Sequence, residues 1–95
     1  MLHIVNKSPF EKDAFTSCMG HASSSSTVLL IEDGVFAALK GSAVADQLSK
    51  AKVVALQSDV AARGIEANLA EGIELVDYAG FVDLVTENRT VQSWV

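Results

Sequence analysis

The sequence predicts a three-layer α/β/α domain with a mainly parallel sheet of four to five short strands. Two observations lead to this prediction. Short aliphatic runs recur along the 95 residues, and each is followed by a segment that begins with helix-capping residues. Strands that alternate with helices form βα units, in which helices cover both faces of a parallel sheet. No linker or internal repeat divides the chain, so we expect one domain over residues 1–95.

The first strand is expected at Leu2–Val5, and a helix from Pro9 to about Gly20 should follow it. Ser8 is a suitable N-cap, Pro9 fits the first helical turn, and Glu11 completes a capping box. Apolar residues recur on one face of this helix: Phe10, Ala14, Phe15, Cys18, Met19 and Ala22. The serine-rich segment 22–26 precedes a strand rather than a helix, so we interpret it as a connector.

The middle of the chain contains the clearest buried strand, the continuous aliphatic run Val28–Ile31. Asp33 should cap a short helix at Val35–Leu39, and Ser42 should cap a second at about Ala43–Lys50. Paired acids such as Glu32 and Asp33 beyond a strand could hold a metal. Helix capping by Asp33 is the simpler interpretation, so no metal site is expected here.

The second half predicts two further strands with their helices. Val53–Leu56 should be the third strand. Ser58 should then cap a short helix at Asp59–Arg63, and Gly64 should end that helix in the left-handed conformation. Ile73–Val76 should be the fourth strand. Asp77 should cap a helix that runs from Tyr78 to about Glu87. The apolar face of this helix contains Tyr78, Phe81, Val82 and Val85. A last, edge strand is expected at Thr90–Val95.

Composition limits the function. Hydrophobic residues make up 49% of this small chain, so some apolar surface should meet another subunit. The net charge is −5 and the seven Lys and Arg residues are scattered, which argues against direct binding of nucleic acid. No apolar run approaches the ~20 residues that span a bilayer, and the start of the chain does not resemble a signal peptide. One cysteine allows no internal disulfide, so we expect a cytoplasmic protein without membrane contact.

Cys18 is the one candidate for sulfur chemistry. It lies late in its predicted helix, where the partial negative charge of the helix end disfavours a thiolate. We therefore interpret Cys18 as a buried packing residue, with a sulfur-carrying thiol at a subunit contact as the alternative. His21 follows at a spacing that could activate the thiol, but the helix should already be ending at Gly20.

Two further residues are candidates for contacts with a partner. His3 lies in a predicted strand, where histidine is more often a hydrogen-bonded core or interface residue than a base. Trp94 is the only tryptophan, and it must either pack on its own domain or anchor a partner. The glycines form no dinucleotide-binding pattern, and we expect no cofactor and no catalytic residue.

Several segments together resemble the TusB/DsrH family over nearly the full length of the chain. They are Met1-Leu2-His3 with Lys7-Ser8-Pro9-Phe10, Leu29-Leu30-Ile31-Glu32-Asp33-Gly34-Val35 with Ala37-Ala38, Asp59-Val60-Ala61-Ala62-Arg63-Gly64, Val76-Asp77-Tyr78-Ala79-Gly80-Phe81-Val82-Asp83-Leu84, and Val91-Gln92-Ser93-Trp94. No single segment is decisive, but their order and spacing make the resemblance fairly specific.

The resemblance implies a subunit of a heterohexamer that relays sulfur as a protein persulfide, with TusC/DsrF-like and TusD/DsrE-like subunits as partners. The sulfur would pass through a downstream acceptor protein toward 2-thiolation of the tRNA wobble uridine. In the DsrH branch it would serve dissimilatory sulfur oxidation. The essential cysteine would belong to the TusD/DsrE-like partner, which makes this chain a non-catalytic or accessory subunit. A stand-alone thiol sulfurtransferase using Cys18, or a small flavin or nucleotide module, is the alternative of another class.

Overall fold

The structure is a computed structural model that describes residues 1–95, and it contains one five-stranded sheet. The strands lie in the order β4-β3-β2-β1-β5, and every neighbouring pair is parallel. Their bounds are β1 (Leu2–Val5), β2 (Thr27–Leu30), β3 (Lys52–Leu56), β4 (Glu74–Val76) and β5 (Val91–Trp94). The helices are α1 (Ala14–His21), α2 (Gln57–Ala62) and α3 (Tyr78–Glu87), and the 3₁₀ segments are η1 (Glu32–Ala38), η2 (Ala45–Gln47) and η3 (Glu66–Asn68). The predicted fold class is confirmed.

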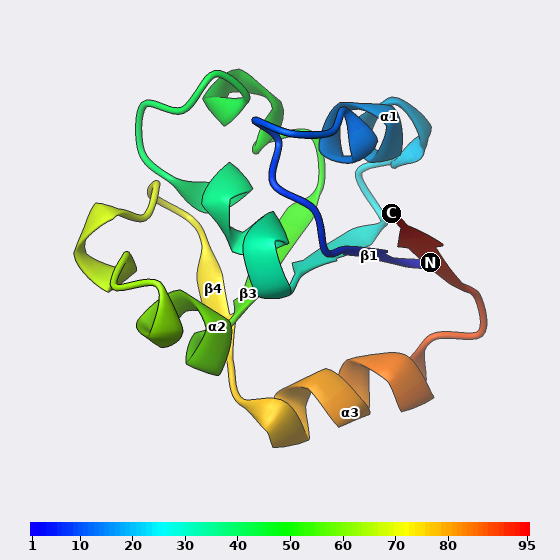
Figure 1. Cartoon of the computed structure of the whole chain (residues 1–95). Coiled ribbons are helices and arrows are strands. Elements are labelled where there is room, and N and C mark those ends of the chain that lie inside the picture. Colours follow the sequence, from blue (N-terminus) through cyan, green and yellow to red (C-terminus); the bar gives the residue numbers. More distant parts are fainter.

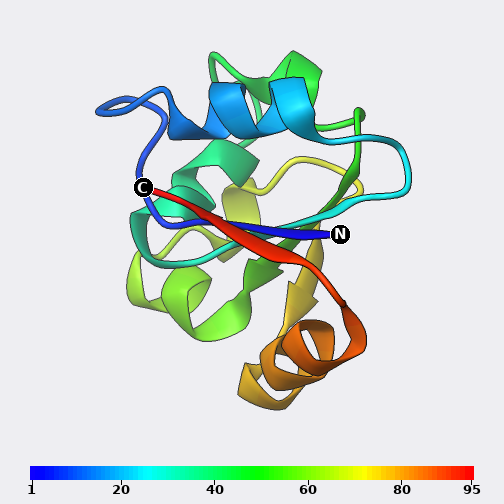
Figure 2. The ribbon, with the colours of Figure 1, turned by 90° about the vertical axis from the view of Figure 1, so that its right-hand side faces the viewer.

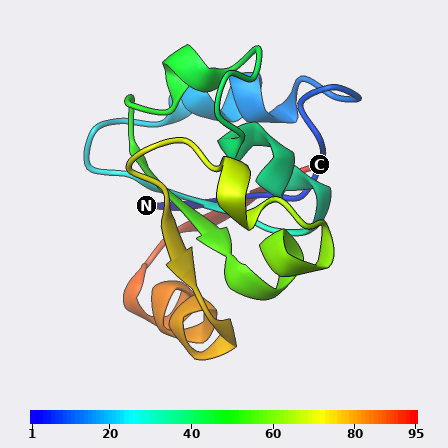
Figure 3. The ribbon, with the colours of Figure 1, turned by 90° about the vertical axis from the view of Figure 1, so that its left-hand side faces the viewer.

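The strand order explains how the helices are distributed. From β1 to β4 each connection steps in the same direction across the sheet, and the last connection returns from β4 to the far side of β1. Crossovers between parallel strands are right-handed, so steps in opposite directions place their helices on opposite faces. Figures 1, 2 and 3 accordingly show α1 on one side of the sheet and α3 on the other.

The face under α1, which we call the α1 face, holds most of the core. Its cluster contains 14 buried residues, drawn from alternate positions of the central strands and from α1, η1 and α2. Phe15 is the largest of its fully buried side chains. The cluster on the opposite α3 face contains only three buried residues, Leu2, Leu29 and Val54. None of the helices combines the length and the apolar character needed to cross a bilayer.

Several local predictions are confirmed. The Asp77 side chain accepts a hydrogen bond from the Gly80 amide at 2.8 Å and caps α3. Gly64 has a φ of 65° after α2, as expected for a left-handed stop. The last segment forms β5, an edge strand paired with β1.

The predicted start of the first helix was wrong. The Ser8 carbonyl accepts hydrogen bonds from the amides of Glu11 and Lys12, and the Ser8 side chain accepts one from Phe10 at 3.2 Å. These bonds close a separate turn, so α1 begins only at Ala14. Phe10 consequently lies outside the apolar helix face and is 64% exposed.

Three further predicted N-caps were also wrong. Asp33 lies inside η1, which begins at Glu32 without a side-chain cap. Ser42 precedes only the short η2, and its buried hydroxyl has no partner. Ser58 lies within α2, which begins one residue earlier. In each case the capping residue type was present, but the chain turns at a different residue.

Candidate functional site

Cys18 lies in the last turn of α1, as its position in the sequence indicated. Its carbonyl accepts the hydrogen bond from the Ala22 amide that ends the helix. Its side chain is fully buried in the core of the α1 face. Burial raises the pKa of the Cys18 thiol to about 11. At neutral pH the group is therefore a protonated thiol without access to a substrate, which makes it a poor nucleophile.

His21 does not activate this thiol. Its ring is exposed, and Nδ1 donates to the Ser17 carbonyl at 2.9 Å. The raised pKa of Cys18 has burial as its one resolved cause, with no lowering contribution from a cation. The two residues therefore do not form the Cys–His pair that nucleophilic catalysis requires.

His3 and Trp94, 91 residues apart in sequence, lie side by side in the sheet. The Trp94 indole Nε1 donates a hydrogen bond to His3 Nδ1 at 3.1 Å. His3 is 1% exposed, whereas Trp94 is half-buried with its ring centroid 5.2 Å from that of His21. The pair connects β5 to β1 beneath α1. Contact of either residue with a partner stays a prediction, and only Trp94 has surface left for it.

The hydrogen bond from Trp94 also determines the tautomer of His3, and the surroundings of the ring determine its charge. Because Nδ1 accepts a hydrogen bond, the proton of the neutral ring is on Nε2, which is buried without a partner. Burial lowers the pKa of His3, and the positive amino terminus and His21 lower it further. His3 is therefore neutral at physiological pH and acts as a structural hydrogen-bond acceptor.

Acidic residues gather at the carboxyl edge of the sheet, where the segments after β2 and β3 meet. Arg63 donates from Nε to Asp33 at 3.0 Å, and its terminal nitrogens lie 2.9 Å from Asp33 and 3.7 Å from Asp59. The Glu32 amide, in a left-handed conformation with a φ of 49°, donates to Asp59 at 2.7 Å. No group of three potential metal ligands is found in the chain.

Arg63 is the member of this cluster that sequence reasoning missed. It neutralises acids that could otherwise attract a metal. The predicted topology is the signal that could have identified Arg63, because the carboxyl ends of β2 and β3 are neighbours in a parallel sheet.

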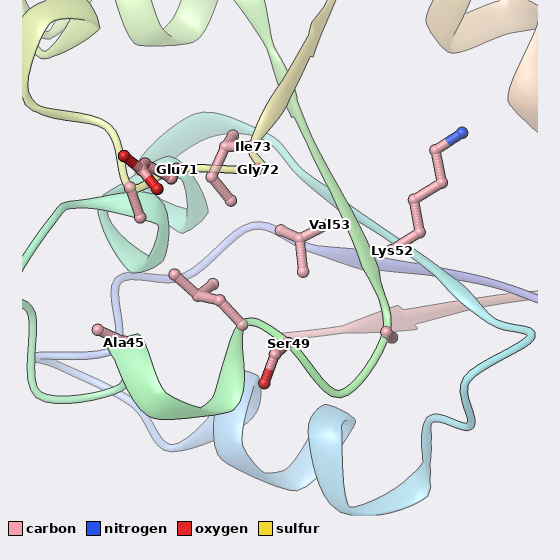
Figure 4. A pocket seen from close by; sticks show the side chains of 10 residues that line it. Ala45, Ser49, Lys52, Val53, Glu71, Gly72 and Ile73 are labelled. Atoms are coloured by element: carbon pink, nitrogen blue, oxygen red, sulfur yellow. The ribbon is translucent and has the colours of Figure 1, made fainter.

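Two hollows open on the surface. The larger, about 380 Å³, lies between η2 and the starts of β3 and β4 (Figure 4). Its lining is mainly aliphatic, and its charged groups, Lys52 and Glu71, stand on opposite sides. The smaller, about 330 Å³, is lined by Gln57, Ser58, Ala61, Asp77 and Tyr78. Neither contains a cysteine, a histidine or an acid–base pair typical of catalysis.

The most unusual surface of the molecule is α3. None of its ten residues is buried, although its sequence is apolar. Phe81 and Leu84 pack on the small core of the α3 face and are only half-buried. Tyr78, Val82 and Val85 are 72%, 41% and 38% exposed. The predicted apolar side of this helix thus divides into a part that meets the sheet and a part that faces outward.

Comparisons with known proteins identify both the family and the fold. Residues 7–91 match the family described as DsrH like protein. Protein TusB of Escherichia coli K12 is 35% identical over 96 aligned positions, which cover 99% of this chain and all of the relative. The solution structure of Thermotoga maritima protein Tm0979 is similar, with a TM-score of 0.69 and 26% identity over 95% of this chain and 97% of that one. The E. coli ychN protein has the same fold, with a TM-score of 0.81 at 16% identity over 98% and 97% of the two chains.

Proposed function

The chain belongs to the DsrH-like family, and from this premise we propose that it is a non-catalytic subunit of the tRNA sulfur-relay system. In this proposal it is part of a cytoplasmic heterohexamer with TusC/DsrF-like and TusD/DsrE-like subunits. The complex passes persulfide sulfur through an acceptor protein toward 2-thiolation of the wobble uridine. The full-length similarity to TusB supports this branch.

The observation that carries the non-catalytic role is the state of Cys18. A sulfur carrier needs an accessible thiolate, whereas Cys18 is fully buried with a raised pKa and no activating cation. The same observation argues against a stand-alone sulfurtransferase that uses Cys18. The carrier cysteine therefore lies on a partner, and this chain supplies structure.

Charge supports an indirect route to tRNA. The chain has five more acidic than basic residues, and Arg63 is already paired with Asp33 and Asp59. This leaves no row of free cationic side chains that could bind phosphates. In this proposal tRNA meets the acceptor protein and a thiolating enzyme, and never this chain.

Transfer from a persulfidated donor to the assembled complex tests the role of Cys18, with the intact mass of every subunit measured. Cys18→Ala should leave assembly and most sulfur transfer unchanged, and should lower the stability by roughly 1 kcal/mol through loss of a buried atom. If the added sulfur resides mainly on this chain and Cys18→Ala stops the flow, the non-catalytic role is refuted.

Deletion of the gene tests the destination of the sulfur. We expect mass spectrometry of digested total tRNA to show loss of the 2-thio group from the wobble uridine. Unchanged 2-thiouridine together with failed oxidation of stored sulfur would assign the chain to the DsrH branch instead.

A further inference from the structure

We propose that α3 is the docking surface for a different chain, one that presents an apolar patch bordered by Lys or Arg. We call the docking surface the α3 stripe and define it as Tyr78, Val82 and Val85. This inference rests on the proposed function, because it specifies where the subunit meets a partner and what that partner's surface contains.

Helix geometry places the three residues on one flank of α3. Positions 78, 82 and 85 are separated by four and three residues, so their side chains form a continuous row. Phe81 and Leu84 occupy the adjoining side and pack against the sheet. The α3 stripe is therefore apolar surface that the domain itself does not use, although burial of such side chains is favourable.

Tyr78 has the properties of an anchor residue. It is 72% exposed, yet its ring is held edge-on against Phe81, with centroids 5.9 Å apart and an interplanar angle of 86°. An aromatic side chain that is oriented before binding loses little conformational freedom on binding, and tyrosine is frequent among the dominant residues of interfaces. The smaller hollow beside it gives a partner side chain a place to insert.

Charge indicates the kind of partner. Asp77 lines that hollow, and Asp83 and Glu87 are exposed on α3, which carries no Lys or Arg. A second copy docked through the same face would place acids near acids, which opposes self-association. A Lys or Arg side chain in the hollow would lie next to the Asp77 carboxylate, so a partner with basic residues around an apolar centre is complementary.

Co-expression with the TusC-like and TusD-like chains of the same organism tests this surface. Tyr78→Ala should raise the dissociation constant of the complex about 30-fold, which is the effect expected for an anchor residue. Phe10→Ala is the matched control, because Phe10 is 64% exposed but lies in the turn before α1. Asp83→Lys should slow association and reduce its dependence on salt, whereas Asp46→Lys on η2 should change neither.

Each outcome decides a separate point. If the unmodified chain binds neither partner, the proposed function fails and this surface fails with it. If the complex forms but Tyr78→Ala and Asp83→Lys bind as well as their controls, only the docking surface is refuted. If light scattering shows a dimer of the chain alone that Tyr78→Ala dissociates, the occupant is a second copy, and the choice of a basic, different partner is wrong.

Discussion

The two faces of the sheet differ in how completely they are covered. The α1 face is covered by α1 and η1 and contains Phe15, Cys18 and Val35, all with no exposed surface. The α3 face is covered by one helix, none of whose residues is buried. The cause is topological, because three right-handed crossovers step one way and a single crossover returns. The α1 face thus stabilises the domain, and the α3 face is where we propose that assembly takes place.

The largest difference should appear when a large side chain is truncated on each face. Phe15→Ala removes a fully buried ring and should lower the free energy of unfolding by about 3–5 kcal/mol. Val85→Ala on α3 should cost less than about 1 kcal/mol, because Val85 is already 38% exposed. Urea denaturation at low protein concentration measures both, and equal losses would contradict the contrast between the faces.

The buried thiol of the α1 face should make the domain sensitive to alkali. Cys18 has a folded pKa of about 11, above the value of about 8.5 for an unfolded thiol. Its stabilising contribution is therefore complete below pH ~8.5 and is lost as the pH rises through 11, by at most about 3 kcal/mol. The stability advantage of the unmodified chain over Cys18→Ala should shrink over this range, and a loss above about 1 kcal/mol would make Cys18→Ala the more stable chain. A difference independent of pH would mean that Cys18 is accessible to water.

Close packing on the α1 face should also distinguish two glycines. A Cβ at Gly34 would overlap the Val5 carbonyl oxygen, which is held in place by the Ile31 amide. Gly34→Ala should therefore cost about 1–3 kcal/mol. Gly20, in α1, has nothing within 4 Å of an added Cβ, and Gly20→Ala should stabilise the helix by up to about 1 kcal/mol. Thermal unfolding measures both, and similar shifts would argue against tight packing at η1.

The smallest expected effect concerns the link between β5 and β1. Trp94→Phe keeps an aromatic ring but removes the hydrogen bond to His3, which should cost about 1 kcal/mol. Because the pKa of His3 is lowered, its stabilising contribution is complete above pH ~6.5 and is lost as the pH falls below that value. His3→Gln should reduce this loss in acid. Denaturation at pH 5 and pH 7 checks both variants, and unchanged acid sensitivity in His3→Gln would show that other groups cause it.

The sequence predicted the elements of the sheet better than the coverage of its faces. The local sequence was enough to predict the N-cap Asp77, because its side chain bonds to an amide only three residues away. It was also enough to predict the left-handed conformation of Gly64. The start of α1 was missed because Ser8 has capping chemistry that a tight turn uses equally well. The salt bridge of Arg63 with Asp33 and the bond of Trp94 with His3 join distant parts of the chain, so no local pattern contains them.

For the candidate site, the burial of Cys18 followed from helical periodicity, and its raised pKa follows from that burial. The excess of apolar residues predicted a subunit contact without locating it. The location that we propose for this contact rests on the strand order, because only the return from β4 to β5 leaves α3 alone on its face.

Hydrogen–deuterium exchange of this chain, alone and in complex with the TusC-like and TusD-like chains proposed as its partners, tests the central claim most directly. We expect the amides of α3 to exchange rapidly in the free chain, since the helix is solvent-exposed, and to be strongly protected in the complex. The amides of α1 and β2 should be protected to the same extent in both states. Protection on assembly that is confined to the α1 side, with α3 unchanged, would contradict the account.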